Sequence, residues 1–311
     1  MNMIPNTKLF ASAFLLFVFG LALVIPVVPS ASSRNTTSLL HAALEDSSSA
    51  PTRSAVPVLL AQGAMVFDPL HNAVLFQKNA DTPHGIASIT KIMTAFAALD
   101  RLGEGEIITI SADAVGTEGA EGGLLVGERF TLKNLAAIML TASSNDAAAA
   151  IAEHVGRLYG ATYFPESQQV FVRMMNEQAR AMGLTRTIFR NPTGLDLDEK
   201  AGILSNTSTA WDMAILITRT LRDTALWDLH RAATTIVSEN GVPHHLVSTH
   251  ELFGSLPGIW NGKTGFTDTA GGALATIVEA PVGKLSIIVV LGSTRDGRFE
   301  DTKALLDWLR N

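Results

Sequence analysis

Ser88 and Lys91 stand three residues apart in the stretch GIASITKIMTAF, residues 85–96, whose other positions are mostly apolar. Residues at this spacing share one face of a helix, so the hydroxyl and the amine can meet. A serine becomes a nucleophile when a neighbouring base takes its proton. Lysine has an ordinary pKa of about 10.4, but burial beside other cations lowers this pKa by several units. The pair therefore indicates either covalent catalysis or an N-cap serine followed by a surface lysine.

A second polar cluster, Ser143-Ser144-Asn145, interrupts the long apolar pattern LAAIMLTASSNDAAAAIAEHV. Buried polar groups need hydrogen-bond partners, so this cluster either lines a cleft or marks a helix break capped by serine and asparagine. A serine two residues before an asparagine is not a rare pattern, because Ser33 and Ser238 begin it too.

A third cluster, Lys263-Thr264-Gly265, occurs once in the chain and precedes a strand that we expect at 273–279. At that place the lysine and threonine side chains would project from a sheet edge, and the glycine would let a ligand approach the backbone closely. The alternative is a plain turn before a strand.

Composition excludes several kinds of function. The chain has 311 residues, no cysteine, 17% charged residues and a net charge of −6. The absence of cysteine removes disulfides, thiolate nucleophiles and cysteine metal sites. No run of basic residues occurs, so we expect no nucleic-acid partner. His244, His245 and His250 lack a carboxylate at metal-binding spacing; we expect them at the surface near a turn, and we expect neither metal nor cofactor.

The periodicity of apolar residues predicts strands at both chain ends and helices between them. This arrangement favours an α/β (α+β) fold, in which an antiparallel sheet built from both chain ends carries an inserted helical subdomain. The expected elements are a hairpin within 63–81, helices at 88–99, 131–155, 171–182 and 208–221, a hairpin formed by 273–279 and 285–291, and a helix at 301–310.

Residues 118–128, EGAEGGLLVGE, form a glycine-rich segment between the first two polar clusters. The segment lacks the lysine and the Ser/Thr of a phosphate-binding P-loop. We expect it to border the cleft ahead of the helix that carries the second cluster.

The N-terminus predicts export. An uncharged apolar run covers residues 9–28, which is long for the core of a cleavable signal and close to the length of a membrane span. We therefore assign 1–31 to a signal peptide or an N-terminal membrane anchor, 32–55 to a Ser/Thr-rich linker, and 56–311 to a catalytic domain. The domain would then lie at the extracytoplasmic face of the cell membrane, or be secreted or periplasmic.

The three clusters appear in the order of the S-x-x-K, S-x-N and K-T-G motifs of penicillin-binding proteins and class A β-lactamases. With the stretches MGLTRTIFRNPTGLD and GKTGFTDTAGG, the chain resembles the D-alanyl-D-alanine carboxypeptidases, which are low-molecular-mass penicillin-binding proteins of the peptidase S11 type. The resemblance runs from about Gly63 to Leu309 and implies a β-lactamase/transpeptidase-like fold. Residues 191–195, NPTGL, stand where a class A β-lactamase would carry its deacylating glutamate.

The resemblance also implies roles for the clustered residues. Ser88 would attack the carbonyl between the two D-alanines of a peptidoglycan stem peptide, with Lys91 as its base. Ser143 and Lys263 would relay a proton to the departing D-alanine, and Asn145 would hold a substrate amide. β-Lactams would be covalent inhibitors.

Four further residues would bind substrate in such an enzyme. Thr264 would hold the terminal carboxylate, and Arg298 matches a position that can assist it. The backbone N–H groups of Ser88 and Phe266 would form the oxyanion hole, and Gly265 between the strand residues would allow the close approach of substrate. Phe266 replaces a polar or tyrosine residue that is often found there.

Three alternatives remain open for function. The same fold supports a β-lactamase and a D,D-endopeptidase that cuts cross-links, and both would use the same serine. A non-catalytic sensor domain that is acylated by β-lactams, or that docks cell-wall peptide, is the third. The complete set of motifs argues against the sensor, because a pure binder has no need of the lysine base.

Overall fold

The structure is a computed structural model, and it describes residues 56–120, 122–196, 201–204, 206–223 and 226–311. The signal or anchor expected at 1–31 and the linker expected at 32–55 lie outside the described residues, so both stay predictions. In the part of the chain that the structure describes, no helix is both long and apolar enough to cross a membrane.

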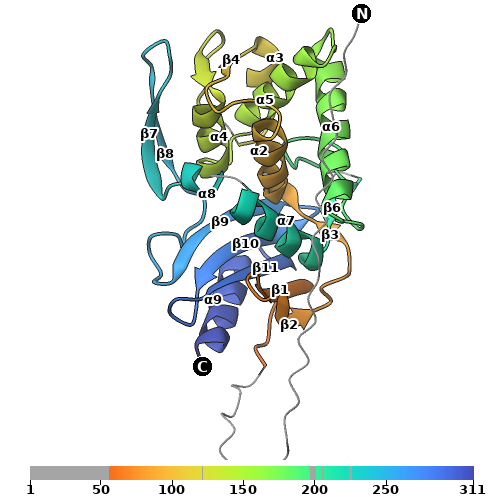
Figure 1. Ribbon diagram of the computed structural model, residues 1–311, viewed down its shortest axis with the longest axis vertical. Coiled ribbons are helices and arrows are strands. Elements are labelled where there is room, and N and C mark those ends of the chain that lie inside the picture. The colour runs from red at the N-terminus through yellow and green to blue at the C-terminus, as the bar shows by residue number, and fades with distance from the viewer. Residues whose placement is uncertain (1–55, 121, 197–200, 205, 224–225) are drawn as a thin grey trace, which may run out of the picture. The chain divides into compact units, whose positions relative to one another are not determined.

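A five-stranded sheet unites the two ends of the described chain (Figure 1). The strand order is β2-β1-β11-β10-β9, and every neighbouring pair is antiparallel. Gly63 of β1 pairs with Leu291 of β11, which confirms the sheet built from both chain ends. The strands are β1 (Gly63–Asp68), β2 (Ala73–Lys78), β9 (Ile259–Thr267), β10 (Gly271–Glu279) and β11 (Leu285–Ser293).

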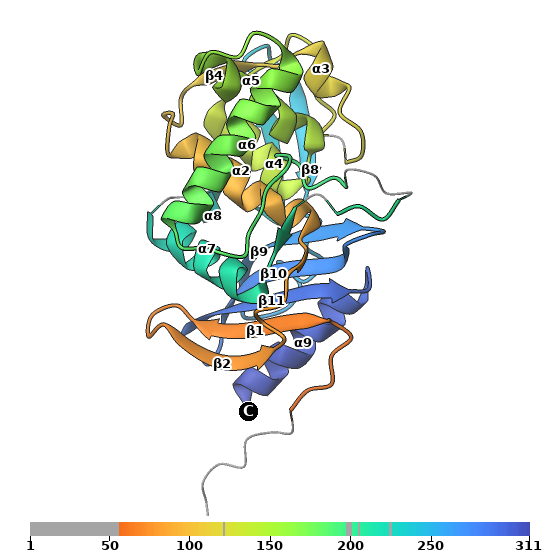
Figure 2. The same cartoon turned by 90° about the vertical axis from the view of Figure 1, so that its right-hand side faces the viewer.

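The two faces of this sheet are both buried, because successive side chains of a strand point to opposite sides. Met65 and Val289 belong to the apolar core shared with the helices. Val66 and Ile288 face the opposite way and pack in a second core with the last helix, α9 (Gly297–Arg310). Figure 2 shows α9 against the sheet, with β2 lowest and β9 highest among the five strands.

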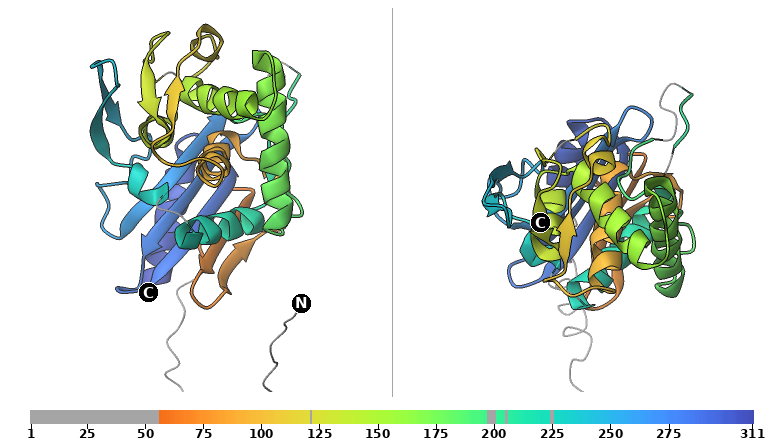
Figure 3. Two further views of the ribbon diagram at one scale, coloured as in Figure 1. Left: turned by 45° about the horizontal axis from the view of Figure 1, so that its top comes forward. Right: turned by 90° about the horizontal axis from the view of Figure 1, so that it is seen from above.

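The helical subdomain surrounds one central helix, α2 (Lys91–Leu99), which is buried along almost its whole length. It contacts α4, α5, α6 and α7, and Figure 3 shows it nearly end-on in the middle of them. A helix that is apolar all round has to lie inside the protein. The other helices are the 3₁₀ turn η2 (Ala87–Thr90), α3 (Ala112–Val115), α4 (Leu132–Thr141), α5 (Asn145–Leu158), α6 (Phe164–Ala181), α7 (Ala210–Asp223) and α8 (Leu226–Leu229).

Three two-stranded pairs complete the described fold. They join β3 (His84–Gly85) to β6 (Thr207–Ser208), β4 (Ile107–Thr109) to β5 (Arg129–Thr131), and β7 (Ala233–Val237) to β8 (Pro243–Val247). None of these pairs was predicted from the sequence, since each strand is short.

Three predictions differ from the structure near the polar clusters. The helix expected over 131–155 is broken at 142–144 into α4 and α5. The helix expected from Ser88 begins as the 3₁₀ turn η2 and becomes α-helical only at Lys91. Lys263 does not precede a strand but lies inside one, β9, where it pairs with Ala275.

The prediction of surface histidines near a turn was wrong for two of the three. His244 is buried and hydrogen-bonds with Glu128 Oε1 at 2.9 Å. His250 is buried and hydrogen-bonds with Thr276 Oγ1 at 3.1 Å. Side chains alternate between the two faces of β8, so His244 points inward while its neighbour His245 is exposed.

Candidate active site

Ser88 lies in the 3₁₀ turn that leads into α2, and it is partly exposed although its neighbours are buried. Ala87 before it has a φ of +44°, a conformation that L-residues rarely adopt. Two glycines from distant segments pack onto this turn. A Cβ on Gly194 would lie 2.1 Å from the Ala87 oxygen, and a Cβ on Gly265 would lie 3.0 Å from the Ser88 nitrogen. Glycine is therefore required at both places, because any side chain would push the segments apart.

Lys91, one turn later, is fully buried, and its amine contacts three separate segments of the chain. Lys91 Nζ lies 2.8 Å from Ser88 Oγ, 2.7 Å from Asn145 Oδ1 and 2.6 Å from the carbonyl oxygen of Thr193. The structure thus joins the first predicted cluster to the second. Thr193 was not predicted, because a backbone carbonyl leaves no side-chain signal in a sequence.

The pKa values of the two buried lysines are both lowered. Burial, and then the charge of Lys263, hold the pKa of Lys91 well below its usual range, while the Asp146 carboxylate opposes this shift. Burial, and then the nearby Arg298, lower the pKa of Lys263 to about 7. A lysine with such a pKa can accept and return protons near neutral pH.

Ser143 and Ser144 form the break between α4 and α5. Ser143 has a φ of +60°, and its hydroxyl accepts a hydrogen bond from Lys263 Nζ at 2.8 Å. Such strained backbone is found preferentially at functional sites. Ser144 is the N-cap of α5 and accepts a hydrogen bond from Ala147 N at 2.9 Å. Its φ of −58° is an ordinary one, in contrast to that of Ser143.

Strand β9 carries the third cluster along the sheet edge. Lys263 is 1% exposed, and its pairing with Ala275 places it on the face that meets the helices. The Thr264 hydroxyl lies 2.5 Å from the hydroxyl of Thr249, a residue that was not singled out from the sequence. Phe266 is half-buried, and the Arg295 guanidinium lies 4.2 Å from its ring centre.

Arg298, at the start of α9, lies against the carbonyl side of this strand rather than free in a cleft. Its Nη1 donates a hydrogen bond to the Gly265 oxygen at 2.7 Å, and the side chain is buried. The guanidinium therefore fixes the backbone next to Thr264 and adds positive charge near Lys263.

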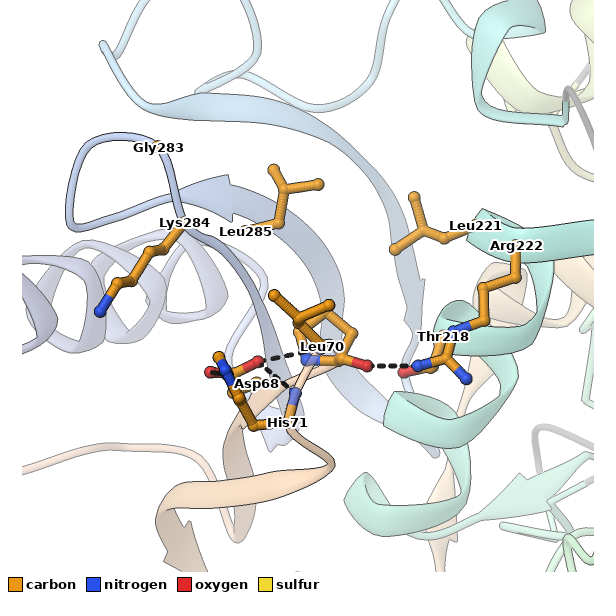
Figure 4. A pocket seen from close by; sticks show the side chains of 10 residues that line it. Asp68, Leu70, His71, Thr218, Leu221, Arg222, Gly283, Lys284 and Leu285 are labelled. Atoms are coloured by element: carbon orange, nitrogen blue, oxygen red, sulfur yellow. Dashed lines mark hydrogen bonds and ion pairs between the residues drawn. The ribbon is translucent and has the colours of Figure 1, made fainter.

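A separate hollow of about 330 Å³ lies between the β1–β2 turn, the end of α7 and the β10–β11 turn. Leu70, Leu221 and Leu285 point into it from three segments (Figure 4). Arg222 donates a hydrogen bond to the Pro69 oxygen at 2.6 Å. The residues described around this hollow do not bring a serine next to a lysine, so it is not a candidate for acyl transfer.

Comparison with known proteins assigns the family. The profile of the peptidase S11 family, D-alanyl-D-alanine carboxypeptidase, matches residues 50–294. The chain belongs to this family. The S11 chain is 31% identical over 256 residues to the D-alanyl-D-alanine carboxypeptidase DacF of Bacillus subtilis, covering 80% of itself but 61% of that relative's length. It is 29% identical to a D-alanyl-D-alanine endopeptidase of Pseudomonas aeruginosa, covering 87% of itself and 84% of the relative.

Solved structures of the same fold resemble this S11 peptidase along most of its length. The D-alanyl-D-alanine carboxypeptidase of Mycobacterium tuberculosis H37Rv superposes with a TM-score of 0.72 at 26% identity, covering 83% of this chain and 94% of that one. The Streptomyces K15 DD-transpeptidase gives a TM-score of 0.72 at 25% identity, with 81% and 97% covered. The S11 peptidase therefore has the penicillin-binding protein fold that the motifs implied.

Proposed function

We propose that this chain is a serine-type D-alanyl-D-alanine carboxypeptidase, which removes the terminal D-alanine from peptidoglycan stem peptides through an acyl-enzyme on Ser88. The observation that carries the proposal is the 2.8 Å contact between Ser88 Oγ and the buried amine of Lys91. Family membership supports the substrate class, and this contact supports Ser88 as the nucleophile.

Acylation begins with proton transfer from Ser88 to Lys91. A neutral lysine has two N–H groups and one lone pair, and the Asn145 and Thr193 oxygens accept the two N–H groups. The lone pair is then directed at Ser88 Oγ, which loses its proton as it attacks the carbonyl carbon. Burial lowers the pKa of Lys91 and so favours the neutral amine that this step needs.

The tetrahedral intermediate needs donors for its oxyanion. The N–H groups of Ser88 and Phe266 supply them, since Gly265 lets β9 come within van der Waals contact of the Ser88 turn. Loss of one such donor typically lowers the rate by about 10²–10³-fold. The pair is preorganised, because one N–H belongs to a strained turn and the other to a strand.

Departure of D-alanine needs a proton on its nitrogen. Ser143 Oγ is 2.8 Å from Lys263 Nζ, and the pKa of about 7 makes Lys263 able to give a proton and take it back. The Ser143 hydroxyl passes the proton from this amine to the leaving group. The hydroxyl of Thr264, with the positive charge of Lys263 and Arg298 behind it, binds the terminal carboxylate of the substrate.

Hydrolysis of the acyl-enzyme needs a base for water. The turn at 191–195 contributes the Thr193 carbonyl and no glutamate. After acylation Lys91 holds the Ser88 proton and Lys263 has given one up, so the proton returns from Lys91 to Lys263 through solvent. Lys91 then takes a proton from the attacking water and passes it to Ser88 Oγ as the acyl group leaves. β-Lactams acylate Ser88 by the same first step. We place the reaction outside the cytoplasm, at the membrane face or beyond it, because the sequence of residues 1–31 predicts export.

A D,D-endopeptidase is the second candidate. The endopeptidase relative from Pseudomonas aeruginosa is covered over 84% of its length, whereas DacF is covered over 61%. An endopeptidase cuts the same kind of bond but must accept a larger group after the scissile carbonyl.

The test is D-alanine release from diacetyl-Lys-D-Ala-D-Ala by the full-length protein beside its Ser88→Ala variant. We expect release by the parent and none by the variant. Cross-linked muropeptide dimers, tested in parallel, distinguish the endopeptidase, and rapid penicillin turnover would indicate a β-lactamase. A stable penicillin adduct without turnover of either peptide would refute the enzymatic proposal in favour of a sensor.

A further inference from the structure

The glycine-rich segment singled out in the sequence borders the second cluster, as expected. Residues 117–120 and 122–124, which overlap its first half, are here called the cleft loop. Most of its residues are exposed, yet its backbone makes hydrogen bonds to buried side chains at the start of α5. An exposed loop held in this way is ordered by the groups beneath it, not by its own packing.

The cleft loop holds Asn145 at two points. Asn145 Nδ2 donates a hydrogen bond to the Glu118 oxygen at 2.8 Å, and Asn145 N donates one to the Ala120 oxygen at 2.7 Å. With Nδ2 fixed, the amide can only turn its oxygen toward Lys91 Nζ, 2.7 Å away. The position of the loop therefore decides whether Asn145 meets Lys91.

Asp146, the next residue, holds the loop in turn. The Gly122 N–H donates to both oxygens of the Asp146 carboxylate, each at 3.0 Å. The carboxylate is 3% exposed and also contacts the Ser144 hydroxyl and Ala147 N. Hydrogen bonds to a buried charged group are stronger than those between neutral groups.

Two glycines of the loop are needed for this contact. A Cβ on Gly119 would lie 2.5 Å from Asn145 Nδ2, and a Cβ on Gly122 would lie 2.7 Å from Ser144 Oγ. By contrast, a Cβ on Gly103, on another loop, would meet no atom within 4 Å. The backbone of the cleft loop thus packs directly against side chains at the start of α5, and the contact leaves no space for a methyl group.

We propose that Asp146 is a positioning residue for acylation: it clamps the cleft loop onto α5, and the loop's carbonyl groups then hold the Asn145 amide against Lys91. Asp146 touches neither Ser88 nor a substrate bound to it in this scheme. The inference rests on the proposed function only in so far as Lys91 is the base for Ser88.

A double-mutant cycle tests the clamp. Asp146→Ala and Asn145→Ala are made singly and together in the full-length protein, and acylation of Ser88 by a fluorescent penicillin is timed. We expect Asp146→Ala alone to slow acylation about tenfold or more, the usual effect of losing a hydrogen bond to a buried charge. In the Asn145→Ala background the same change should have less than about a twofold effect, since coupled residues are not additive. Both backgrounds are compared at a pH high enough that the rate no longer depends on the protonation of Lys91. Equal losses in both backgrounds would overturn the proposal.

Gly122→Ala perturbs the same contact from the loop side, and it replaces Asp146→Ala as the test if Asp146→Ala does not fold. Its matched control is Gly103→Ala, where the methyl group has free space. We expect faster amide hydrogen exchange at 117–120 and slower acylation in Gly122→Ala, with neither change in Gly103→Ala. Slower acylation with unchanged exchange in the loop would contradict a clamp.

The pH dependence of the acylation rate distinguishes the effect of the Asp146 charge on Lys91 from the effect of the Asp146 hydrogen bonds on the loop. The charged groups that act on Lys91 are Lys263 from β9, which lowers its pKa, and Asp146 from α5, which raises it. Asp146→Asn keeps an acceptor for Gly122 but removes the charge, so the acidic limb of acylation should move to lower pH. An acidic limb at the same pH in Asp146→Asn as in the parent would contradict an effect of the Asp146 charge on Lys91.

The two proposals can fail separately. A parent protein that is acylated by penicillin but releases no D-alanine would refute the carboxypeptidase proposal, and the double-mutant cycle could still be measured. A parent that releases D-alanine while the cycle is additive would refute the clamp alone, and a parent that is never acylated would refute both.

Discussion

Gly265→Ala is expected to slow acylation without unfolding the protein. The added Cβ would lie 2.7 Å from the Ile86 oxygen and 3.0 Å from the Ser88 nitrogen, whereas ordinary contact begins at 3.4 Å. Restoring that contact moves β9 away from the Ser88 turn by about 0.7 Å, since packed interiors cannot absorb the overlap. The Phe266 N–H moves with the strand, so the oxyanion hole widens by a similar distance.

A misplacement of about 1 Å at reacting groups typically lowers a rate by about 10²-fold. We therefore expect the second-order rate of Ser88 acylation by a fluorescent penicillin to fall by roughly a hundredfold. The assay is stopped-flow labelling followed by gel fluorescence, with the melting temperature measured beside it. Gly105→Ala is the control, because a methyl group there meets no atom within 4 Å. If the folded Gly265→Ala variant is acylated at a rate within threefold of the parent's, the inference that the two N–H donors must lie close together is refuted.

Two other predictions follow from the buried charges. Lys263 has a pKa of about 7 in the folded protein against an ordinary value of 10.5, so the unfolded chain binds more protons between these values. The free energy of unfolding should therefore rise with pH across this window, relative to a Lys263→Met variant. Chemical denaturation of both proteins at pH 7 and 10 measures this change. A free energy of unfolding that falls with pH relative to the variant would contradict the reasoning. His244→Phe removes the 2.9 Å hydrogen bond to the buried Glu128 carboxylate, which keeps its bond from Leu125 N, and should destabilise the protein by about 1.5–3 kcal/mol. Thermal unfolding measures this, and a loss below about 1 kcal/mol would contradict the reasoning.

The sheet was predictable because its strands follow simple patterns. β-Branched apolar runs at 273–279 and 285–291 fit a strand buried on both faces, and the hairpin within 63–81 has turn residues between two apolar runs. The motif residues were predictable by type and order, and the structure brings Ser88, Lys91 and Asn145 into contact.

The remainder of the site depends on groups that leave little trace in a sequence. The Thr193 carbonyl is a backbone atom, and its neighbour Gly194 is informative only once its packing on Ala87 is known. The hydroxyl of Thr249 reaches Thr264 across fifteen residues, a distance that no local periodicity reports. The buried His244 was missed because its partner Glu128 lies 116 residues away in the chain, in the loop before β5.

The last strand of the chain, β11, lies in the interior of the sheet, between β1 and β10. Among the strands that the structure describes, the hairpin of β1 and β2 therefore does not pair with the strand that bears Lys263. Strands β11 and β10, which are made near the end of synthesis, lie between them. Pairings of such long sequence separation form slowly. Under the proposed function, Ser88 cannot react with penicillin until β11 has been made and paired, so covalent labelling by penicillin would report the completion of folding and not merely its onset.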